Sequence, residues 1–190
     1  MATAINKRIC PVWMGPILLS PLRRWWQNPR IFLAPWIKPG MTVLDAGCAM
    51  GFFSLPAAEM VGQNGVVLCV DVQDEMLTRL FHRALAAALH ERIMLHCCCQ
   101  SSLHLELWHG RIDFALAVAV VHETIDAGVF FREIKRTLKP LSRCLFVEPK
   151  WHVTAATMRR EIAAATEVGF NVMRQWEWGG MRCALLEKAG

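Results

Sequence analysis

The sequence of 190 residues is short of three features, and each shortage excludes a class of protein. No apolar stretch approaches the length of a membrane span, and the strand-like run over 115–121 has only seven residues. Charged residues make up 19% of the chain against 54% hydrophobic residues, which excludes an intrinsically disordered chain. The Cys-x-x-Cys spacing of zinc and redox sites does not occur. We therefore expect one globular domain with a sizeable core.

Eight cysteines are nonetheless present, and we interpret them as small core residues in a reducing compartment. His96 directly precedes the run 97–99 of three cysteines, which suggests a metal site. Consecutive strand residues point to opposite faces, so these four side chains cannot share one tetrahedral ion, and we predict no metal site. Pro11 and Pro16 interrupt the N-terminal apolar stretch and no Ala-x-Ala cleavage site follows, so we expect a cytoplasmic protein without a signal peptide.

Acidic residues are absent from residues 1–39, which carry six basic residues and four of the eight tryptophans. The whole formal net charge of +5 therefore comes from this segment, since the rest of the chain is close to neutral. We treat residues 1–39 as a basic, tryptophan-rich cap segment and residues 40–190 as the folded domain. Three interpretations of the cap segment stay open: a lid over a site, a membrane-interface contact, or simple packing on the domain.

Strand-like and helix-like segments alternate after residue 40. The expected strands span 41–46, 66–71, 92–98, 113–120 and 142–148. The expected helices span 52–61, 74–90, 127–138 and 154–168. The C-terminal segments 172–178 and 181–187 flank Gly179-Gly180 and read as a β-hairpin. This order predicts a doubly wound parallel sheet with an antiparallel strand at the C-terminal end.

A glycine-bearing turn follows the first expected strand, in the run Val-Leu-Asp-Ala-Gly-Cys-Ala-Met-Gly-Phe over 43–52. The next strand ends in an acid, Asp71. Open parallel sheets bind nucleosides with a glycine turn after one strand and a carboxylate at the end of the next. A dinucleotide fingerprint requires glycine at the third and sixth positions counted from Gly47, where this chain has Ala49 and Phe52. Dinucleotide binding is therefore disfavoured.

The pattern that is present, Asp-x-Gly-x-Ala-x-Gly, resembles motif I of class I S-adenosylmethionine (SAM) methyltransferases, with Ala49 in place of the usual middle glycine. The resemblance covers about residues 38–188. It implies an α/β, Rossmann-like, doubly wound, seven-stranded and mostly parallel sheet with an antiparallel last strand and helices on both faces. It also implies SAM as the cofactor.

The resemblance assigns cofactor-binding positions to the tips of the first four strands. The glycine turn would accept the amino-acid portion of SAM, Asp71 the ribose hydroxyls, and the backbone near Ala117 the ammonium group. The usual acid after the third strand is missing, and Gln100 or Ser101 would replace it. The complete predicted set is Asp45, Gly47, Cys48, Ala49, Gly51, Asp71, Val72, Gln100, Ser101 and Ala117.

Two further residues are candidates for the chemistry. His122 follows the fourth strand and is predicted to be a general base or to orient the acceptor; alternatively it caps the next helix or satisfies buried backbone groups. Glu148, at the end of the fifth strand, is predicted to reach the acceptor, as is His152; alternatively Glu148 pairs with Lys150.

The layout is similar to the ubiquinone/menaquinone-biosynthesis C-methyltransferase-like group, which implies a small-molecule methyl acceptor. No basic stripe continues from the cap segment into the domain, so we expect no nucleic-acid partner. An arsenic acceptor stays open as an alternative if Cys10 and Cys99 converge. A second alternative is a SAM- or nucleoside-binding module, or partner subunit, without turnover. The oligomeric state is not predicted.

Overall fold

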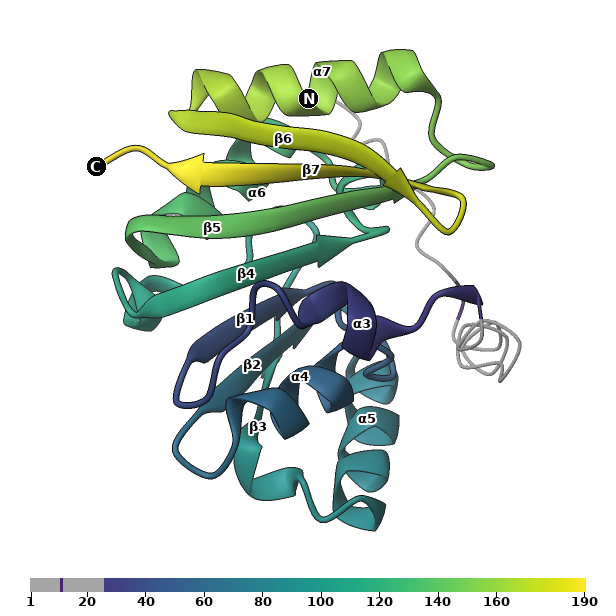
Figure 1. Cartoon of the computed structure of the whole chain (residues 1–190), viewed down its shortest axis with the longest axis vertical. Coiled ribbons are helices and arrows are strands. Elements are labelled where there is room, and N and C mark those ends of the chain that lie inside the picture. The colour runs from purple at the N-terminus through teal and green to yellow at the C-terminus, as the bar shows by residue number, and fades with distance from the viewer. Residues whose placement is uncertain (1–10, 12–25) are drawn as a thin grey trace, which may run out of the picture.

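The computed structural model describes residue 11 and residues 26–190, which form a single seven-stranded sheet with helices on both faces (Figure 1). The strand order is β3-β2-β1-β4-β5-β7-β6. The strands are β1 Thr42–Ala46, β2 Val66–Asp71, β3 Ile93–Cys97, β4 Ile112–Val118, β5 Leu138–Pro149, β6 Phe170–Trp178 and β7 Met181–Lys188. Strands β1 to β5 are parallel, and β7 runs antiparallel to both β5 and β6. The predicted fold class is confirmed.

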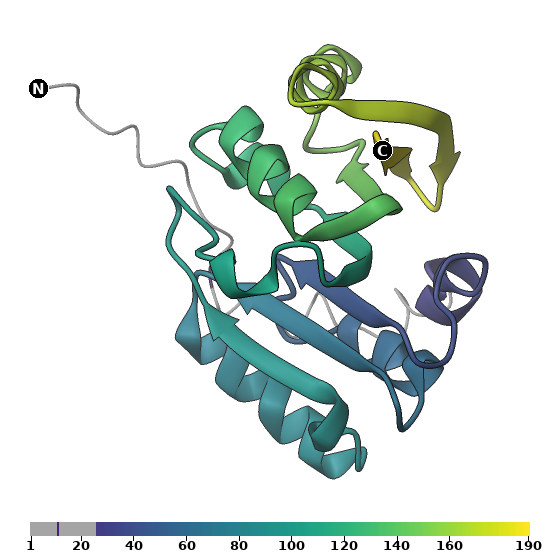
Figure 2. The ribbon, with the colours of Figure 1, turned by 90° about the vertical axis from the view of Figure 1, so that its left-hand side faces the viewer.

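Alternation along each strand divides the core between the two faces of the sheet. Val43 and Leu44 are adjacent in β1, yet they belong to separate clusters of buried side chains. The first cluster packs beneath α3 (Pro29–Leu33), α4 (Ser54–Val61) and α5 (Asp74–Ala86), and the second beneath α6 (Ala127–Thr137) and α7 (Ala155–Glu167). Figure 2 shows α5 and α6 on opposite sides of the strands. The described residues also include three short 3-10 turns: η2 His90–Arg92, η3 Glu106–Trp108 and η4 Val121–Glu123.

The helix boundaries follow from local side-chain and backbone chemistry. Helix α6 begins after Asp126, whose Oδ1 accepts from the backbone N–H of Val129 at 3.0 Å, and Thr154 caps α7 in the same way. Helix α5 ends at Ala86, four residues before the predicted end. Ala88 adopts a left-handed φ of +53°, and this reversal ends the helix.

Part of the predicted cap segment packs on the sheet. Phe32 is buried and stacks on Trp178 of β6, with ring centroids 3.8 Å apart. Trp36 lies over Phe114 of β4, and Arg30 forms an ion pair with Glu59 of α4. Residues 29–39 therefore follow the packing interpretation. Trp26 and Lys38 are exposed. The remaining basic and tryptophan residues of this segment lie, like Cys10, in 1–10 and 12–25, outside the described residues: Lys7, Arg8, Trp13, Arg23, Arg24 and Trp25.

In the described part of the chain, no helix has both the length and the apolar character that crossing a bilayer requires. Among the same residues, no cluster of three or more His, Cys, Asp or Glu side chains could hold a metal ion.

Candidate cofactor and active site

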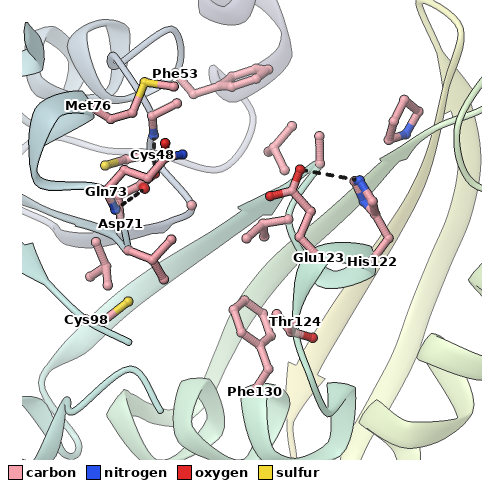
Figure 3. Close-up of a pocket in the computed structure, with 18 of the residues that line it drawn as sticks. Cys48, Phe53, Asp71, Gln73, Met76, Cys98, His122, Glu123, Thr124 and Phe130 are labelled. Atoms are coloured by element: carbon pink, nitrogen blue, oxygen red, sulfur yellow. Dashed lines mark hydrogen bonds and ion pairs between the residues drawn. The ribbon is translucent and has the colours of Figure 1, made fainter. Parts of the chain in front are cut away.

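One cavity of about 1020 Å³ opens over the carboxyl ends of β1, β2, β4 and β5. Ligands of open α/β sheets bind at this edge. One end, here called the glycine-turn end, is lined by residues 47–49, 71–73 and 98–101. The other, here called the histidine end, is lined by His122, Glu123, His152 and the turn 179–181. Figure 3 shows Asp71 and Gln73 at one end and His122 with Glu123 at the other.

The glycine turn is held in a strained shape. Gly47 and Gly51 both have a φ of +79°, and a Cβ on Gly47 would lie 2.5 Å from the side chain of Val120. Glycine at position 47 therefore allows the β1 turn to pass the tip of β4. Ala49 has a φ of +45°, in the left-handed region that costs an L-residue about 1–2 kcal/mol. The residue that departs from the motif carries the strain that glycine would avoid.

Asp71 ties the glycine turn to the tip of β2. Its Oδ2 accepts from the backbone N–H of Ala49 and its Oδ1 from that of Gln73, both at 2.9 Å. Burial raises the pKa of the Asp71 carboxyl, while the hydrogen bonds from Gln73 and Ala49 oppose that rise. Each carboxylate oxygen can accept a further hydrogen bond. Asp71 lines the cavity, as do Val72 and the turn residues 47–49.

Asp45, a predicted cofactor-binding residue, does not reach the cavity wall. It is 2% exposed, does not line the cavity, and accepts from the hydroxyl of Ser54 at 2.6 Å. Burial raises the pKa of Asp45 to about 6, against the hydrogen bond from Ser54 that lowers it. Asp45 therefore joins the end of β1 to the start of α4. Gly51 also lies outside the cavity wall, packed against Leu80 of α5.

The tip of β3 forms a tight turn that reaches the cavity. Two backbone hydrogen bonds link Cys99 with Ser102 and place Gln100 and Ser101 in the cavity wall. Glu133 of α6 fixes this turn, because its carboxylate accepts from the Ser102 hydroxyl and the Leu103 N–H, each at 2.6 Å. The two residues predicted to replace the missing acid are thus brought to the glycine-turn end.

The cysteines of this turn differ in their reactivity. Cys98 and Cys99 line the cavity, whereas Cys97 does not. Hydrogen bonds from Ser101 and His104 lower the pKa of the exposed Cys99 thiol to about 7, and burial raises that of Cys98 to about 12. Cys10, which the arsenic alternative requires next to Cys99, lies outside the described residues.

The predicted contact near Ala117 shifts toward the end of β4. Ala117 is fully buried within the sheet and is absent from the cavity wall, which Val118, Ala119 and Val120 form instead. Ala119 has a φ of +56°, and its N–H donates to the Val147 carbonyl at 2.7 Å. The wall therefore begins one residue beyond the predicted position.

His122 and Glu148, which are 26 residues apart in the sequence, form a hydrogen-bonded pair. Nδ1 of His122 lies 2.7 Å from Oε2 of Glu148, and the His122 backbone N–H donates to Oε1 at 3.1 Å. A carboxylate acceptor requires the proton on Nδ1, so the neutral ring leaves the lone pair of Nε2 available. Lys150 pairs with Glu177 instead of Glu148, and Asp126 instead of His122 caps α6. The capping role for His122 and the Lys150 pairing of Glu148 are therefore not observed.

The surroundings of His122 favour its protonated form. Burial lowers the pKa of the imidazole, but the hydrogen bond that it donates to Glu148 and the charges of Glu148, Glu123 and Glu161 outweigh that cost and raise it. Glu148 is fully buried, and Oε1 of Glu123 lies 3.8 Å from Nε2 (Figure 3). The ring of His152 stands edge-on to that of His122, with centroids 4.7 Å apart. His122 lines the cavity; Glu148 supports it from behind.

Sequence patterns missed several residues of the cavity wall. Met76 of α5 and Phe130 of α6 line it, as do Phe53 and Gln73, which directly precede α4 and α5 (Figure 3). Phe53 and Gln73 directly follow recognised motifs, so adjacency could have identified them. The turn Gly179-Gly180 was predicted as a hairpin, yet only the sheet order brings it to the cavity.

A family model described as a methyltransferase domain matches residues 37–190. The chain belongs to the methyltransferase domain family. The sequence resemblance to class I SAM-dependent methyltransferases is confirmed. A SAM-dependent methyltransferase from Aquifex aeolicus superposes with a TM-score of 0.84 over 94% of this chain and 99% of that chain, at 23% identity, which shows a shared fold.

Curated relatives of this methyltransferase domain differ in their acceptors. A 23S rRNA (uracil(1939)-C(5))-methyltransferase RlmD of Shewanella sp. (strain ANA-3) is 35% identical over 75% of this chain and 29% of its own length. An arsenite methyltransferase of Aquipseudomonas alcaligenes is 28% identical over 68% of this chain and 39% of its own length. The chain thus spans less than half the length of either relative.

Proposed function

We propose that this methyltransferase domain binds SAM at the glycine-turn end of the cavity and methylates a small-molecule acceptor at the histidine end, with His122 as the general base. The observation that carries this proposal is the buried Glu148, which binds both the ring and the backbone of His122. A carboxylate in this position holds an imidazole in one orientation and one tautomer, as a general base requires.

The residues at the glycine-turn end fit the proposed cofactor. Asp71 offers carboxylate lone pairs to ribose hydroxyls, and Val72 offers an apolar surface to the adenine. Gln100 and Ser101 offer polar side chains at the position of the missing acid. When bound, SAM supplies an electrophilic methyl group, so positioning contributes most of the catalysis.

His122 and Glu148 together remove the proton of the acceptor. Nε2 of His122 accepts a proton from an O–H or N–H group, and Glu148 stabilises the resulting imidazolium through Nδ1. Glu123, 3.8 Å from Nε2, adds to this stabilisation. The raised pKa of His122 matches this task, because it favours the charged form that proton transfer creates.

The lining of the cavity supports a small acceptor over RNA. Among the described lining residues there is no Lys or Arg, whereas nucleic-acid binding depends on such side chains. Four carboxylates line the cavity, namely Asp71, Glu123, Asp126 and Glu133. The arsenite methyltransferase is a relative with a small acceptor, and the 23S rRNA methyltransferase is a relative with an RNA acceptor.

The test combines calorimetry with turnover. Calorimetric titration should give saturable binding of SAM and none of NAD, and Asp71→Ala should abolish the former. Release of S-adenosylhomocysteine is then measured with a panel of phenols, amines and thiols, and with a 23S rRNA transcript. We expect turnover with a member of the small-molecule panel and none with the transcript.

The His122→Ala variant separates an enzyme from a binding module. It should keep SAM affinity and lose turnover by about 10²- to 10⁴-fold, while His109→Ala, at an exposed site outside the cavity, should change neither. SAM binding with no turnover on any acceptor would favour the non-catalytic alternative. Turnover on the transcript alone would overturn the small-molecule proposal.

A further inference from the structure

The histidine end of the cavity has two tryptophans in its wall that remain largely open to solvent. Trp26 is 65% exposed and Trp151 is 73% exposed, although both line the cavity. Ligand pockets are lined mainly by hydrophobic and aromatic side chains, so exposed indoles in a cavity wall are candidates for ligand contact. The indole face is also the largest flat apolar surface that a side chain offers.

The turn between β6 and β7 brings these two indoles to the same place. Gly179 and Gly180 have φ values of +51° and +77°, the pattern of a tight hairpin turn. A Cβ on Gly180 would lie 3.4 Å from the Trp151 ring, and one on Gly179 would lie 3.4 Å from Trp26. Side chains at either position would occupy the space in front of the indoles. Gln27 fixes this arrangement, since its amide donates to the Gly179 carbonyl at 2.6 Å.

The charged side chains among the described lining residues disfavour an anionic acceptor. Three of its four carboxylates have structural hydrogen bonds: Asp71 to the glycine turn, Asp126 to α6, and Glu133 to the β3 turn. Glu123 faces His122. The described lining residues include neither Lys nor Arg, and the charge of a protonated His122 is already matched by Glu148. A carboxylate or phosphate on the acceptor would therefore meet no unmatched Lys or Arg charge from these residues. A negative charge would also be repelled by these four groups.

We propose that the acceptor is a planar ring compound without negative charge, of the phenol or aromatic-amine class, which lies over the Gly179-Gly180 turn against Trp26 and Trp151. This inference rests on the proposed function, because it takes the histidine end to be the acceptor site. Stacking on the indoles orients the ring, and its O–H or N–H group reaches Nε2 of His122.

The proposal is tested by calorimetry in the presence of saturating S-adenosylhomocysteine, with three probes of similar size. The probes are 2-naphthol, its anionic analogue 2-naphthoate, and the non-planar alcohol decahydro-2-naphthol. We expect 2-naphthol to bind at least about tenfold more tightly than either analogue. Trp151→Ala and Trp26→Ala should each weaken 2-naphthol binding by about tenfold and leave S-adenosylhomocysteine binding unchanged.

Leu107→Ala is the matched control, because Leu107 is 82% exposed and lies outside the cavity. It should leave the affinity for all three probes unchanged, and thermal unfolding checks that each variant is folded. Equal or tighter binding of 2-naphthoate, or unchanged 2-naphthol binding in both tryptophan variants, would overturn the inference. If the unmodified chain does not bind S-adenosylhomocysteine, the proposed function itself is overturned. Failure of the inference and failure of the proposed function are therefore distinguishable.

Discussion

The two ends of the cavity are built by different means. At the glycine-turn end, backbone conformation does most of the work: Gly47 and Ala49 have positive φ values, and Asp71 binds backbone N–H groups. At the histidine end, side chains from distant segments meet, as Glu148 of β5 meets His122 of η4. The first end depends on local sequence and the second on the order of strands in the sheet. A fold family can therefore retain the first while its members vary the second.

Electrostatics differ between the ends in the same way. The carboxylate of Asp71 is held by dipoles of the backbone, and burial raises its pKa. The imidazole of His122 is held by charged groups, and they raise its pKa despite burial. Titration between pH 6 and 8 should consequently alter the histidine end more than Asp71.

The largest expected effect is on turnover, from Glu148→Gln. The amide of glutamine donates an N–H to Nδ1, so the neutral ring must carry its proton on Nε2. Nε2 then has no lone pair with which to accept a proton from the acceptor. We expect turnover to fall by about 10³-fold, roughly 4 kcal/mol in the barrier, with SAM affinity unchanged. Steady-state kinetics of S-adenosylhomocysteine release, paired with calorimetry, measures both. Glu148→Asp is the control that keeps the charge, and it should retain more activity than the glutamine variant.

Turnover and stability of the unmodified chain should change with pH in opposite directions. His122 must be neutral to accept a proton, so turnover should rise with pH through its pKa, which lies above the ordinary 6.5. The stability contribution runs the other way. Because the folded-state pKa is raised, the His122–Glu148 ion pair contributes fully below pH 6.5 and is lost as pH rises through the raised pKa. A turnover profile that falls over this interval would contradict the assignment of His122 as the base.

At the glycine-turn end, Gly47→Ala tests whether backbone geometry is decisive. The added methyl group meets Val120 at 2.5 Å and stands at a φ of +79°, so strain and overpacking both act. We expect a loss of roughly 3 kcal/mol in the free energy of unfolding, measured by urea denaturation, and loss of SAM binding. Gly40→Ala is matched in φ, at +82°, but has open space around the methyl group. It should cost only the strain of about 1–2 kcal/mol; equal costs would show that the contact with Val120 is unimportant.

The sequence predicted the glycine-turn end better than the histidine end for the same physical reason. Residues 47–49, 71 and 72 follow strands whose hydrophobic pattern was clear, and all of them line the cavity. Asp45 was predicted as a cofactor-binding residue; it lies outside the cavity wall and accepts a hydrogen bond from Ser54. His122 and Glu148 were each identified, yet their pairing depends on β4 and β5 being neighbours. The role of the turn 179–181 depends on β7 lying beside β5, which no local pattern states.

Strain at Ala49 provides a third comparison, because its relief should strengthen the glycine-turn end. Ala49→Gly removes a left-handed alanine, and we expect the free energy of unfolding to rise by about 0.5–1 kcal/mol after the greater entropy of the unfolded chain is counted. Ala119→Gly is the counterpart on β4, with a φ of +56°, and should give a similar gain. If only the first variant also increases SAM affinity in calorimetry, the strain at the turn opposes cofactor binding. A destabilised Ala49→Gly would contradict this account of the turn.

The smallest expected effect is at Lys150, which is close to Glu148 in the sequence but pairs with Glu177. Lys150 pairs with Glu177 near the surface, with 34% and 64% of their side chains exposed, so Lys150→Ala should change the free energy of unfolding by less than about 0.5 kcal/mol. Turnover should be unchanged, because Glu148 keeps both of its bonds to His122. Thermal unfolding and the pH profile of turnover test this together. A shift of the pH profile in Lys150→Ala would mean that the lysine charge reaches the buried pair, and the histidine end would then extend to the surface.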